Sequence, residues 1–260
     1  MASTSETGHA KNVANLLKLN QLIATFGTTY NPSNNTIKPA SLTALYTTAT
    51  AKLTATNTAF TNWKNATNAR ELAFTPLTKQ ATQILGTLQS LGIVQQTIDD
   101  FAFQVNKFRS STTKTPATAP NTTAPTAKII TPLPPIVVTE PIQAHNSTSQ
   151  QSFDNKLQHL EKMILILQSI PTYTPNETPY KIATLQTQLT TLITLNNTAN
   201  TSYATLKSAR IDRNTIFYNT LTGMLSVVKL TKAYIRSIYG STSPQYHAIT
   251  ALKFVKVIRK

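Results

Sequence analysis

Hydrophobic residues recur along this chain at alternating steps of four and three. One such run extends from Leu42 to Leu88, and a second extends from Leu185 to Ile238. This heptad spacing places the apolar side chains on one face of a helix, as in antiparallel bundles and coiled coils. Further apolar residues beside both runs widen that face enough for bundle packing. The pattern therefore predicts an all-α protein with two long, heptad-patterned helical stretches.

The two halves of the chain match when one is shifted by 143 residues against the other. Residues 17–74 share 17 identities over the 58 positions that they align with residues 160–217. Low complexity explains the threonine matches but not the following pairs: Tyr30-x-Pro32 with Tyr173-x-Pro175, Arg70 with Arg213, and Phe74 with Phe217. We interpret the match as an internal duplication. Each copy has a short helix, a proline-containing loop with a packing tyrosine, and then the long helical stretch.

Three positions are expected to interrupt the helices. The heptad seam loses its apolar character within Arg70–Pro76 and within Arg213–Asn219, so a break or kink is expected in both. Pro76 supports the first break, because proline disrupts a helix interior but fits a first turn. Gly240 is expected to end the last long helix as a C′ glycine, and Pro244 to prevent its resumption.

Composition divides the chain into five segments. Residues 1–10 form a polar N-terminus expected to be disordered, 11–110 a first helical bundle, 111–151 a linker, 152–240 a second bundle, and 241–260 a basic tail. The linker holds seven prolines among Thr, Ala and Ser, a composition that cannot pack a core. The predicted architecture is two tandem antiparallel helical-bundle units joined by a Pro/Thr-rich linker.

The second half contains four distinctive motifs: Tyr173-x-Pro175-Asn176-Glu177, Ser208-Ala209-Arg210-Ile211-x-Arg213-Asn214, Leu221-Thr222-Gly223 and Tyr239-Gly240-Ser241-x-Ser243-Pro244-Gln245-Tyr246. These motifs resemble those of an uncharacterised family of helical, two-unit proteins from Bacteroidetes-type bacteria. The resemblance reaches the first half only through the duplication. It implies a helical fold but no activity and no site residues, since none is known for that family.

The composition gives little support for catalysis. The chain has no cysteine, nine acidic residues and four histidines, and none of these has the spacing of a zinc or di-iron site. Gly-rich phosphate loops and nucleophile-elbow motifs are also missing from the sequence. We therefore expect a non-enzymatic protein with no cofactor and no catalytic or metal-binding residues. No signal sequence or apolar run of membrane-spanning length is visible, which predicts a cytoplasmic protein.

The net charge of +15 is the strongest functional signal. The chain carries no acid from Lys229 to Lys260, and this stretch supplies the candidate polyanion-binding residues: Lys229, Lys232, Arg236, Lys253, Lys256, Arg259 and Lys260. A basic end of this kind favours nucleic acid, an anionic surface or an acidic partner. Positive charge that only keeps an acid-poor chain soluble is the competing interpretation.

Other notable residues have simpler interpretations. The repeat-equivalent seam arginines Arg70 and Arg213 are expected to be structural, each with its stem in the bundle and its head beside a neighbouring acid. The alternative is a polyanion or partner contact made twice. Asn57 and Asn200 are candidates for setting helix register. The aromatic residues Phe60, Trp63 and Tyr203 lie on the seam and are therefore expected in the core.

These observations favour a non-catalytic structural or interaction protein made of duplicated helical bundles. Its partners would be a second copy of the chain or another protein, bound through the helical seams. The alternative is a basic, largely sequence-non-specific nucleic-acid-binding protein that acts through phosphate contacts. A second alternative is a membrane-active helical bundle.

Overall fold

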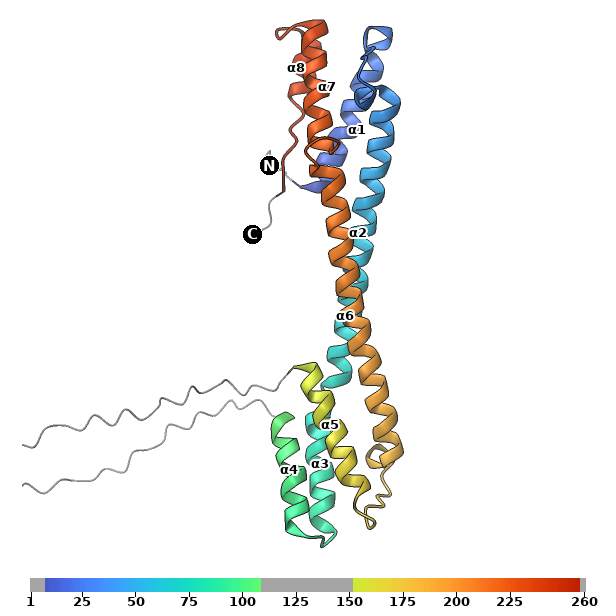
Figure 1. Ribbon diagram of the computed structural model, residues 1–260, viewed down its shortest axis with the longest axis vertical. Coiled ribbons are helices and arrows are strands. Elements are labelled where there is room, and N and C mark those ends of the chain that lie inside the picture. Colours follow the sequence, from blue (N-terminus) through green and yellow to red (C-terminus); the bar gives the residue numbers. More distant parts are fainter. Residues whose placement is uncertain (1–7, 109–151, 258–260) are drawn as a thin grey trace, which may run out of the picture. The chain divides into compact units, whose positions relative to one another are not determined.

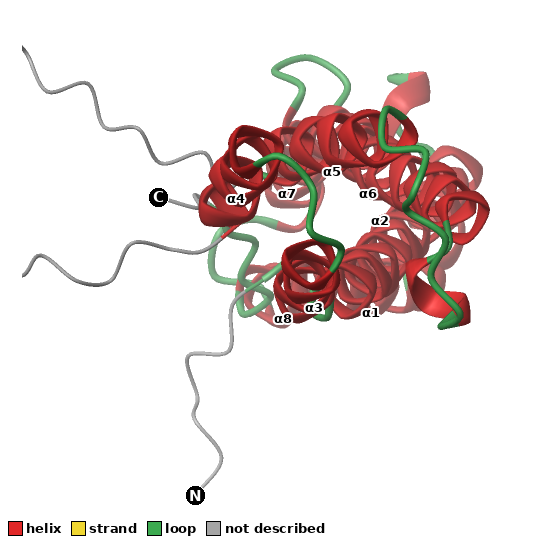
Figure 2. Ribbon diagram, turned by 90° about the horizontal axis from the view of Figure 1, so that it is seen from below, coloured by secondary structure: helices red, strands yellow, loops and turns green. Residues whose placement is uncertain are grey.

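The computed structural model describes residues 8–108 and 152–257, and within these ranges it contains helices and loops (Figures 1 and 2). The α-helices are α1 (His9–Thr25), α2 (Pro39–Phe74), α3 (Leu77–Ser90), α4 (Gln95–Phe108), α5 (Phe153–Gln168), α6 (Ile182–Tyr218), α7 (Met224–Tyr239) and α8 (Pro244–Thr250). Short 3₁₀ helices are η1 (Gly27–Thr29), η2 (Asn35–Ile37) and η3 (Thr178–Tyr180). The all-α class is confirmed. The predicted linker, 111–151, lies outside the described residues.

The chain forms two compact units, and each combines segments from both halves. Unit 1 comprises residues 1–71 and 195–260, and unit 2 comprises residues 72–194. The expected tandem arrangement, with one bundle in 11–110 and another in 152–240, is therefore not confirmed. The physical reason is the length of α2 and α6, which have 36 and 37 residues. Each of these helices begins in one unit and ends in the other.

Unit 1 has a core to which both ends of the chain contribute. From the first half come apolar side chains of α1, η2 and the start of α2, among them Leu16, Leu19 and Leu42, which are fully buried. From the second half come Phe217 at the end of α6 and Ile235 in α7, also fully buried. Figure 1 shows α1 and α2 beside α7 and α8 in this unit.

Unit 2 has the complementary composition. Helices α3 and α4 come from the first half, and α5 with the start of α6 comes from the second. Their shared core includes Phe101 and Leu88 on one side and Leu167 and Leu185 on the other, all almost completely buried. Burial of such side chains is the main force that holds helices of this kind together.

The two tyrosines of the matching Tyr-x-Pro loops make the same contact. The Tyr30 hydroxyl donates to the carbonyl of Ile37 over 2.6 Å, and the Tyr173 hydroxyl donates to the carbonyl of Tyr180 over 2.9 Å. Both side chains are only 4% exposed. Each bond closes a loop between a short helix and a long one, so the predicted packing role of these tyrosines is confirmed.

The predicted interruptions of the long helices are also present. Helix α2 ends at Phe74 before Pro76, and α6 ends at Tyr218. The second break is stabilised by Asn219, whose side-chain oxygen accepts hydrogen bonds from the backbone N–H groups of Leu221 and Thr222. Gly240 ends α7 at a φ of 83°, as expected. Pro244, however, does not prevent a further helix: it occupies the first turn of α8, where its missing N–H is tolerated.

Threonine is accommodated in α2 and α6 through bonds to their own backbones. The hydroxyls of Thr43, Thr50, Thr187 and Thr191 each donate to the carbonyl four residues earlier. These bonds satisfy the hydroxyls without any tertiary partner. The helical form of such Thr-rich segments therefore depends on the periodic apolar positions rather than on helix propensity.

Candidate polyanion-binding groove

Helix α7 presents three basic side chains on its surface. Lys229, Lys232 and Arg236 lie at spacings of three and four residues and therefore share one face of the helix. The opposite face is fixed by Val227, Thr231 and Ile235, which are buried in unit 1. Packing of the apolar face thus determines where the basic face points.

The residues after α8 form an extended segment, 252–257, that is pinned to the helices of unit 1. The Asn12 side chain donates to the carbonyl of Val255 over 2.8 Å and accepts from the Val255 N–H over 3.1 Å. Asn15 donates to the carbonyl of Lys253 over 2.7 Å. Both asparagines are buried, so these bonds are shielded from water. The predicted basic tail is therefore packed in unit 1 as far as Val257.

A groove of about 730 Å³ lies between α7 and this C-terminal segment. Four of the predicted polyanion-binding residues line it, namely Lys229, Lys232, Arg236 and Lys253. The other lining residues are Leu225, Val228, Ala233, Tyr246, Thr250, Leu252, Phe254 and Val255. We refer to this site as the basic groove. Its lining combines cationic side chains with apolar walls and includes no acid.

Lys232 differs from the other three cations because part of its role is structural. Its ammonium donates to the carbonyl of Leu252 over 2.7 Å and lies 5.5 Å from the centre of the Phe254 ring. Burial lowers its pKa from the usual value, because removing the ammonium from water disfavours the charged form. Lys232 therefore ties the C-terminal segment to α7, whereas Lys229, Arg236 and Lys253 are exposed.

The remaining predicted residues lie elsewhere. Lys256 lines a different cavity, together with Arg213. Arg259 and Lys260 lie outside the described residues. Sequence reasoning did not single out Arg210, which lies beside Arg213 in the lining of that second cavity. Its spacing of three residues from Arg213 on one helix was the signal that could have identified it.

Both seam arginines donate hydrogen bonds to asparagine side chains. Arg70 donates to the side-chain oxygen of Asn196 over 3.1 Å, and Arg213 donates to that of Asn214 over 2.9 and 3.2 Å. Asp212, the acid next to Arg213 in the sequence, forms a 2.8 Å ion pair with Lys52. That pair links α2 to α6 within unit 1.

The expectation that the seam aromatics lie in the core is wrong. Phe60 and Tyr203 are 42% and 43% exposed rather than buried, and they flank the half-buried Trp63 with ring centroids 5.8 Å away on each side. Asn57 and Asn200 are exposed, while the buried asparagine on this part of α6 is Asn196. The register-setting role of Asn57 and Asn200 stays a prediction.

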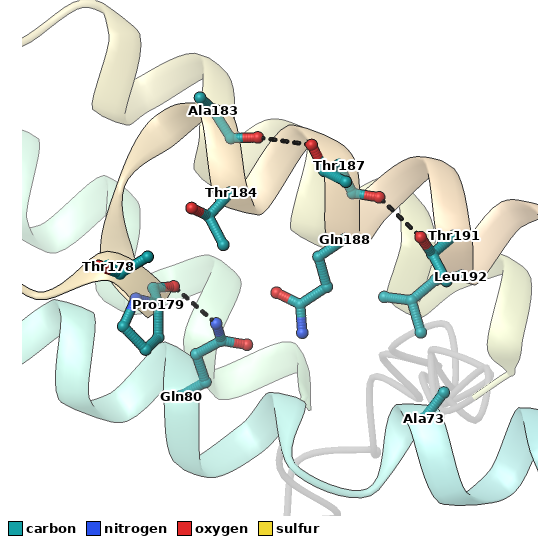
Figure 3. A pocket seen from close by; sticks show the side chains of 10 residues that line it. All are labelled: Ala73, Gln80, Thr178, Pro179, Ala183, Thr184, Thr187, Gln188, Thr191 and Leu192. Carbon is teal, nitrogen blue, oxygen red and sulfur yellow. Dashed lines mark hydrogen bonds between the residues drawn. The ribbon is translucent and has the colours of Figure 1, made fainter.

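A further cavity, in unit 2, has a different chemistry (Figure 3). It measures about 700 Å³ and is lined by Ala73, Gln80, Thr178, Pro179, Ala183, Thr184, Thr187, Gln188, Thr191 and Leu192. The Gln80 amide donates to the carbonyl of Pro179 over 2.9 Å, which joins α3 to η3. None of the lining residues is titratable, so this cavity offers neither acid–base groups nor a charge for an ionic ligand.

Positive charge is concentrated in unit 1. This unit has 16 of the 24 Lys and Arg residues and 3 of the 9 acids, and unit 2 has the other 8 basic and 6 acidic residues. Within the described ranges, no group of three His, Asp or Glu side chains is arranged to hold a metal ion. In the same ranges no helix is both long and apolar enough to cross a membrane.

Comparison with known proteins adds no identification. Neither a protein-family model, nor a curated protein, nor a solved structure matches this chain. The family resemblance drawn from the sequence motifs therefore stays a prediction.

Proposed function

We propose that this chain is a non-catalytic interaction protein, built by duplication of a helical unit, that binds nucleic acid through the phosphate backbone at the basic groove of unit 1. The observation that carries the proposal is the groove itself. It brings Lys253 to the face of α7 that already presents Lys229, Lys232 and Arg236.

The distribution of charge supports a polyanion rather than a small neutral ligand. The sequence has no acid after Asp212, so the groove has no nearby carboxylate in the same stretch to compete for its cations. Cations on an acid-free surface attract phosphates over a distance of about 10 Å at moderate salt. A lysine-rich surface also suits the point-charge contacts that neutralise a phosphate backbone.

The aromatic residues of the groove favour phosphate contact over base recognition. Single-stranded nucleic acids usually stack their bases on exposed rings. Here the Phe254 ring is half-buried, and the Lys232 ammonium lies near its face. A base would have to displace that lysine in order to stack. Binding through the backbone is therefore expected to be largely independent of sequence.

The duplication is supported by equivalent elements at the same 143-residue shift. Adding 143 to the residue numbers of α1 gives 152–168, and helix α5 spans 153–168. The same shift places η2 on the residues of η3. The two loop-closing tyrosine bonds also occupy matching positions. An origin by duplication explains these coincidences, since unrelated segments would not reproduce both the elements and the bonds.

The experiment that tests the proposal is a salt titration of binding. A fluorescent 30-base-pair DNA and the corresponding RNA are titrated with the protein between about 50 and 200 mM salt. The variant Lys229→Gln/Arg236→Gln/Lys253→Gln removes three exposed groove cations and leaves Lys232 in place. We expect the slope of log affinity against log salt to become shallower by roughly three, since each lost phosphate contact accounts for about 0.9.

The matched control removes the same charge outside the groove. Lys18→Gln/Lys38→Gln/Lys64→Gln changes three exposed lysines of unit 1 that do not line the groove. The proposal fails if the control lowers affinity as much as the groove variant, or if the wild-type protein binds neither nucleic acid at 50 mM salt. Circular dichroism on each variant establishes that folding is preserved.

A second candidate function, contact with a protein partner or a second copy of the chain, is favoured by the exposed aromatic cluster. Phe60, Trp63 and Tyr203 present apolar rings on unit 1, and aromatic residues of this kind are enriched at protein interfaces. Sedimentation equilibrium tests self-association. A wild-type protein that sediments as a monomer at 100 µM (roughly the range of weak association) excludes the second copy.

A further inference from the structure

A second cationic cavity lies in unit 1, apart from the basic groove. It measures about 540 Å³ and is lined by His9, Arg210, Arg213, Asn214, Tyr218, Lys256 and Val257. Three of these residues, Arg210, Arg213 and Lys256, are basic and none is an acid. The cavity shares no lining residue with the basic groove, so the two sites can be changed independently.

Arg213 is the most deeply placed of the three cations. Its side chain is only 7% exposed, and its Nε and Nη2 both donate to the side-chain oxygen of Asn214. The amide oxygen orients the guanidinium but brings no negative charge. An arginine keeps its charge even when buried, so Arg213 contributes a fixed positive charge to the wall of the cavity.

The walls of the cavity are held in place by packing and hydrogen bonding. The Tyr218 hydroxyl accepts a hydrogen bond from the N–H of Val257 over 3.1 Å, which fixes the C-terminal segment against α6. The His9 ring packs against Tyr218 and Phe217, with centroid distances of 5.8 and 5.3 Å. The Lys256 ammonium lies 6.0 Å from the Tyr218 ring centre. The lining residues thus come from three segments, α1, α6 and the C-terminal segment, that are already joined.

The helical scaffold alone does not require this set of residues. The positions 143 residues before Arg210, Arg213, Asn214 and Tyr218 carry Thr67, Arg70, Glu71 and Thr75. Only the arginine recurs, and the counterpart of Asn214 is an acid. The shared arginine fits a structural role in both copies, whereas the additional cations and the neutral Asn214 belong to the second copy alone.

We propose that this cavity binds a compact phosphate dianion, either inorganic phosphate or the phosphate group of a small phosphomonoester. Two guanidinium groups offer planar pairs of donors that match phosphate oxygens, and Lys256 adds a point charge. The volume lies within the usual range for small-molecule sites. The proposal does not depend on nucleic-acid binding at the basic groove.

Isothermal titration calorimetry on the full-length protein tests the proposal, with inorganic phosphate and AMP as separate probes in chloride buffer of constant ionic strength. We expect one saturable site per chain for at least one probe. Binding of AMP alone identifies a phosphomonoester site, and binding of both identifies recognition of the phosphate group itself. Absence of saturable binding for both probes up to about 10 mM, a very weak affinity, overturns the proposal.

The residue assignment is tested with Arg210→Gln/Lys256→Gln, which spares the buried Arg213. We expect at least a tenfold loss of affinity for the bound probe, since a charge-assisted contact is lost at each position. The control Lys18→Gln/Lys207→Gln removes the same charge from exposed positions that do not line the cavity. An equal loss in the control would refute the assignment.

If the double variant does not fold, Lys256→Gln alone provides the test, because that side chain is exposed and its approach to the Tyr218 ring is a long one, at 6.0 Å. It should still weaken probe binding, and unchanged binding would contradict the proposal. The triple groove variant Lys229→Gln/Arg236→Gln/Lys253→Gln should bind phosphate as the wild type does. Failure of nucleic-acid binding and failure of phosphate binding are therefore separate results.

Discussion

Cutting the chain between its two halves should leave the fragments bound to each other. Each compact unit takes helices from both halves, so neither half contains a complete core. The change we propose is a specific protease site inserted between Pro125 and Thr126, followed by cleavage of the folded protein. Two tandem bundles would separate after such a cut, whereas units that share helices should not.

The expected strength of the association follows from the buried side chains. In unit 1 the second half contributes Phe217, Met224, Ile235 and Ile249, each fully buried. In unit 2 the first half contributes an equivalent set, Phe74, Leu77, Leu88 and Phe101. Burial of a large apolar side chain contributes about 1.5–3 kcal/mol, so eight contribute roughly 18 kcal/mol. After an association cost of about 10 kcal/mol, the net value corresponds to a micromolar or tighter complex.

The assay is size-exclusion chromatography with light scattering, at a loading of about 50 µM so that a micromolar complex stays assembled. The cleaved protein should elute with the mass of the uncut chain and retain its helical circular dichroism. Each half expressed alone should lose helicity or associate through its exposed core residues. The reasoning is refuted if the cleaved halves elute separately and each keeps full helicity. The uncleaved insertion variant is the control for the effect of the inserted site.

Three further predictions concern the loop-closing hydrogen bonds of Tyr30 and Tyr173, the ionisation of these two tyrosines, and substitutions at two glycines. Tyr30→Phe or Tyr173→Phe should lower the free energy of unfolding by about 1–2 kcal/mol in urea titrations, because a buried carbonyl loses its donor; Tyr203→Phe, at an exposed ring, should change it by less than about 0.5 kcal/mol. Burial raises the pKa of Tyr30 and of Tyr173 to about 12, from an ordinary value of 10, so the folded state keeps both hydroxyls neutral while the unfolded state ionises. The stabilisation is therefore complete below pH 10 and is lost as the pH rises towards 12. Absorbance at the tyrosinate band should show at least two late-ionising tyrosines, since burial also raises the pKa of Tyr218. A single transition near pH 10 for all nine tyrosines would contradict this. Gly223→Ala should destabilise the protein by about 1–3 kcal/mol, since a Cβ there would lie 2.5 Å from the backbone of Asn219. Gly86→Ala, on the open face of α3, should stabilise the protein by roughly 0.5–1 kcal/mol. Thermal melting measures both changes.

The helices were predicted well from the sequence because their positions depend on patterns among residues that are close together in the chain. The apolar positions from Leu42 to Leu88 repeat with the helical period, and Pro76 interrupts them where proline must. Heptad spacing shows which face of a helix is buried but not which helix covers it. The two halves of the chain share one pattern, so the terminal helices of either half could cover the same apolar face. The length of α2 and α6 decides between these pairings.

The candidate site was predictable only where its residues share one helix. Lys229, Lys232 and Arg236 follow from helical spacing, and the structure places them on one groove wall. Lys253 joins them because Asn12 and Asn15, which are about 240 residues away in sequence, hold the C-terminal segment in place. The same anchoring directs Lys256 to the other cavity. Long-range hydrogen bonds from buried asparagines leave no periodic signal in a sequence.

The way the helices pair also changes which parts of the chain contribute to each candidate binding site. In the sequence, the candidate polyanion-binding residues are concentrated between Lys229 and Lys260. In the structure, α7 and the C-terminal segment pack with α1, so both cationic cavities depend on residues from each half: the groove on Asn12 and Asn15, the phosphate cavity on His9. Unit 2, which is nearly neutral, has a cavity lined by threonine and glutamine instead. The asymmetry in charge therefore lies between two compact units that each contain segments of both halves. A variant of the first half is accordingly expected to impair a site whose charges come from the second.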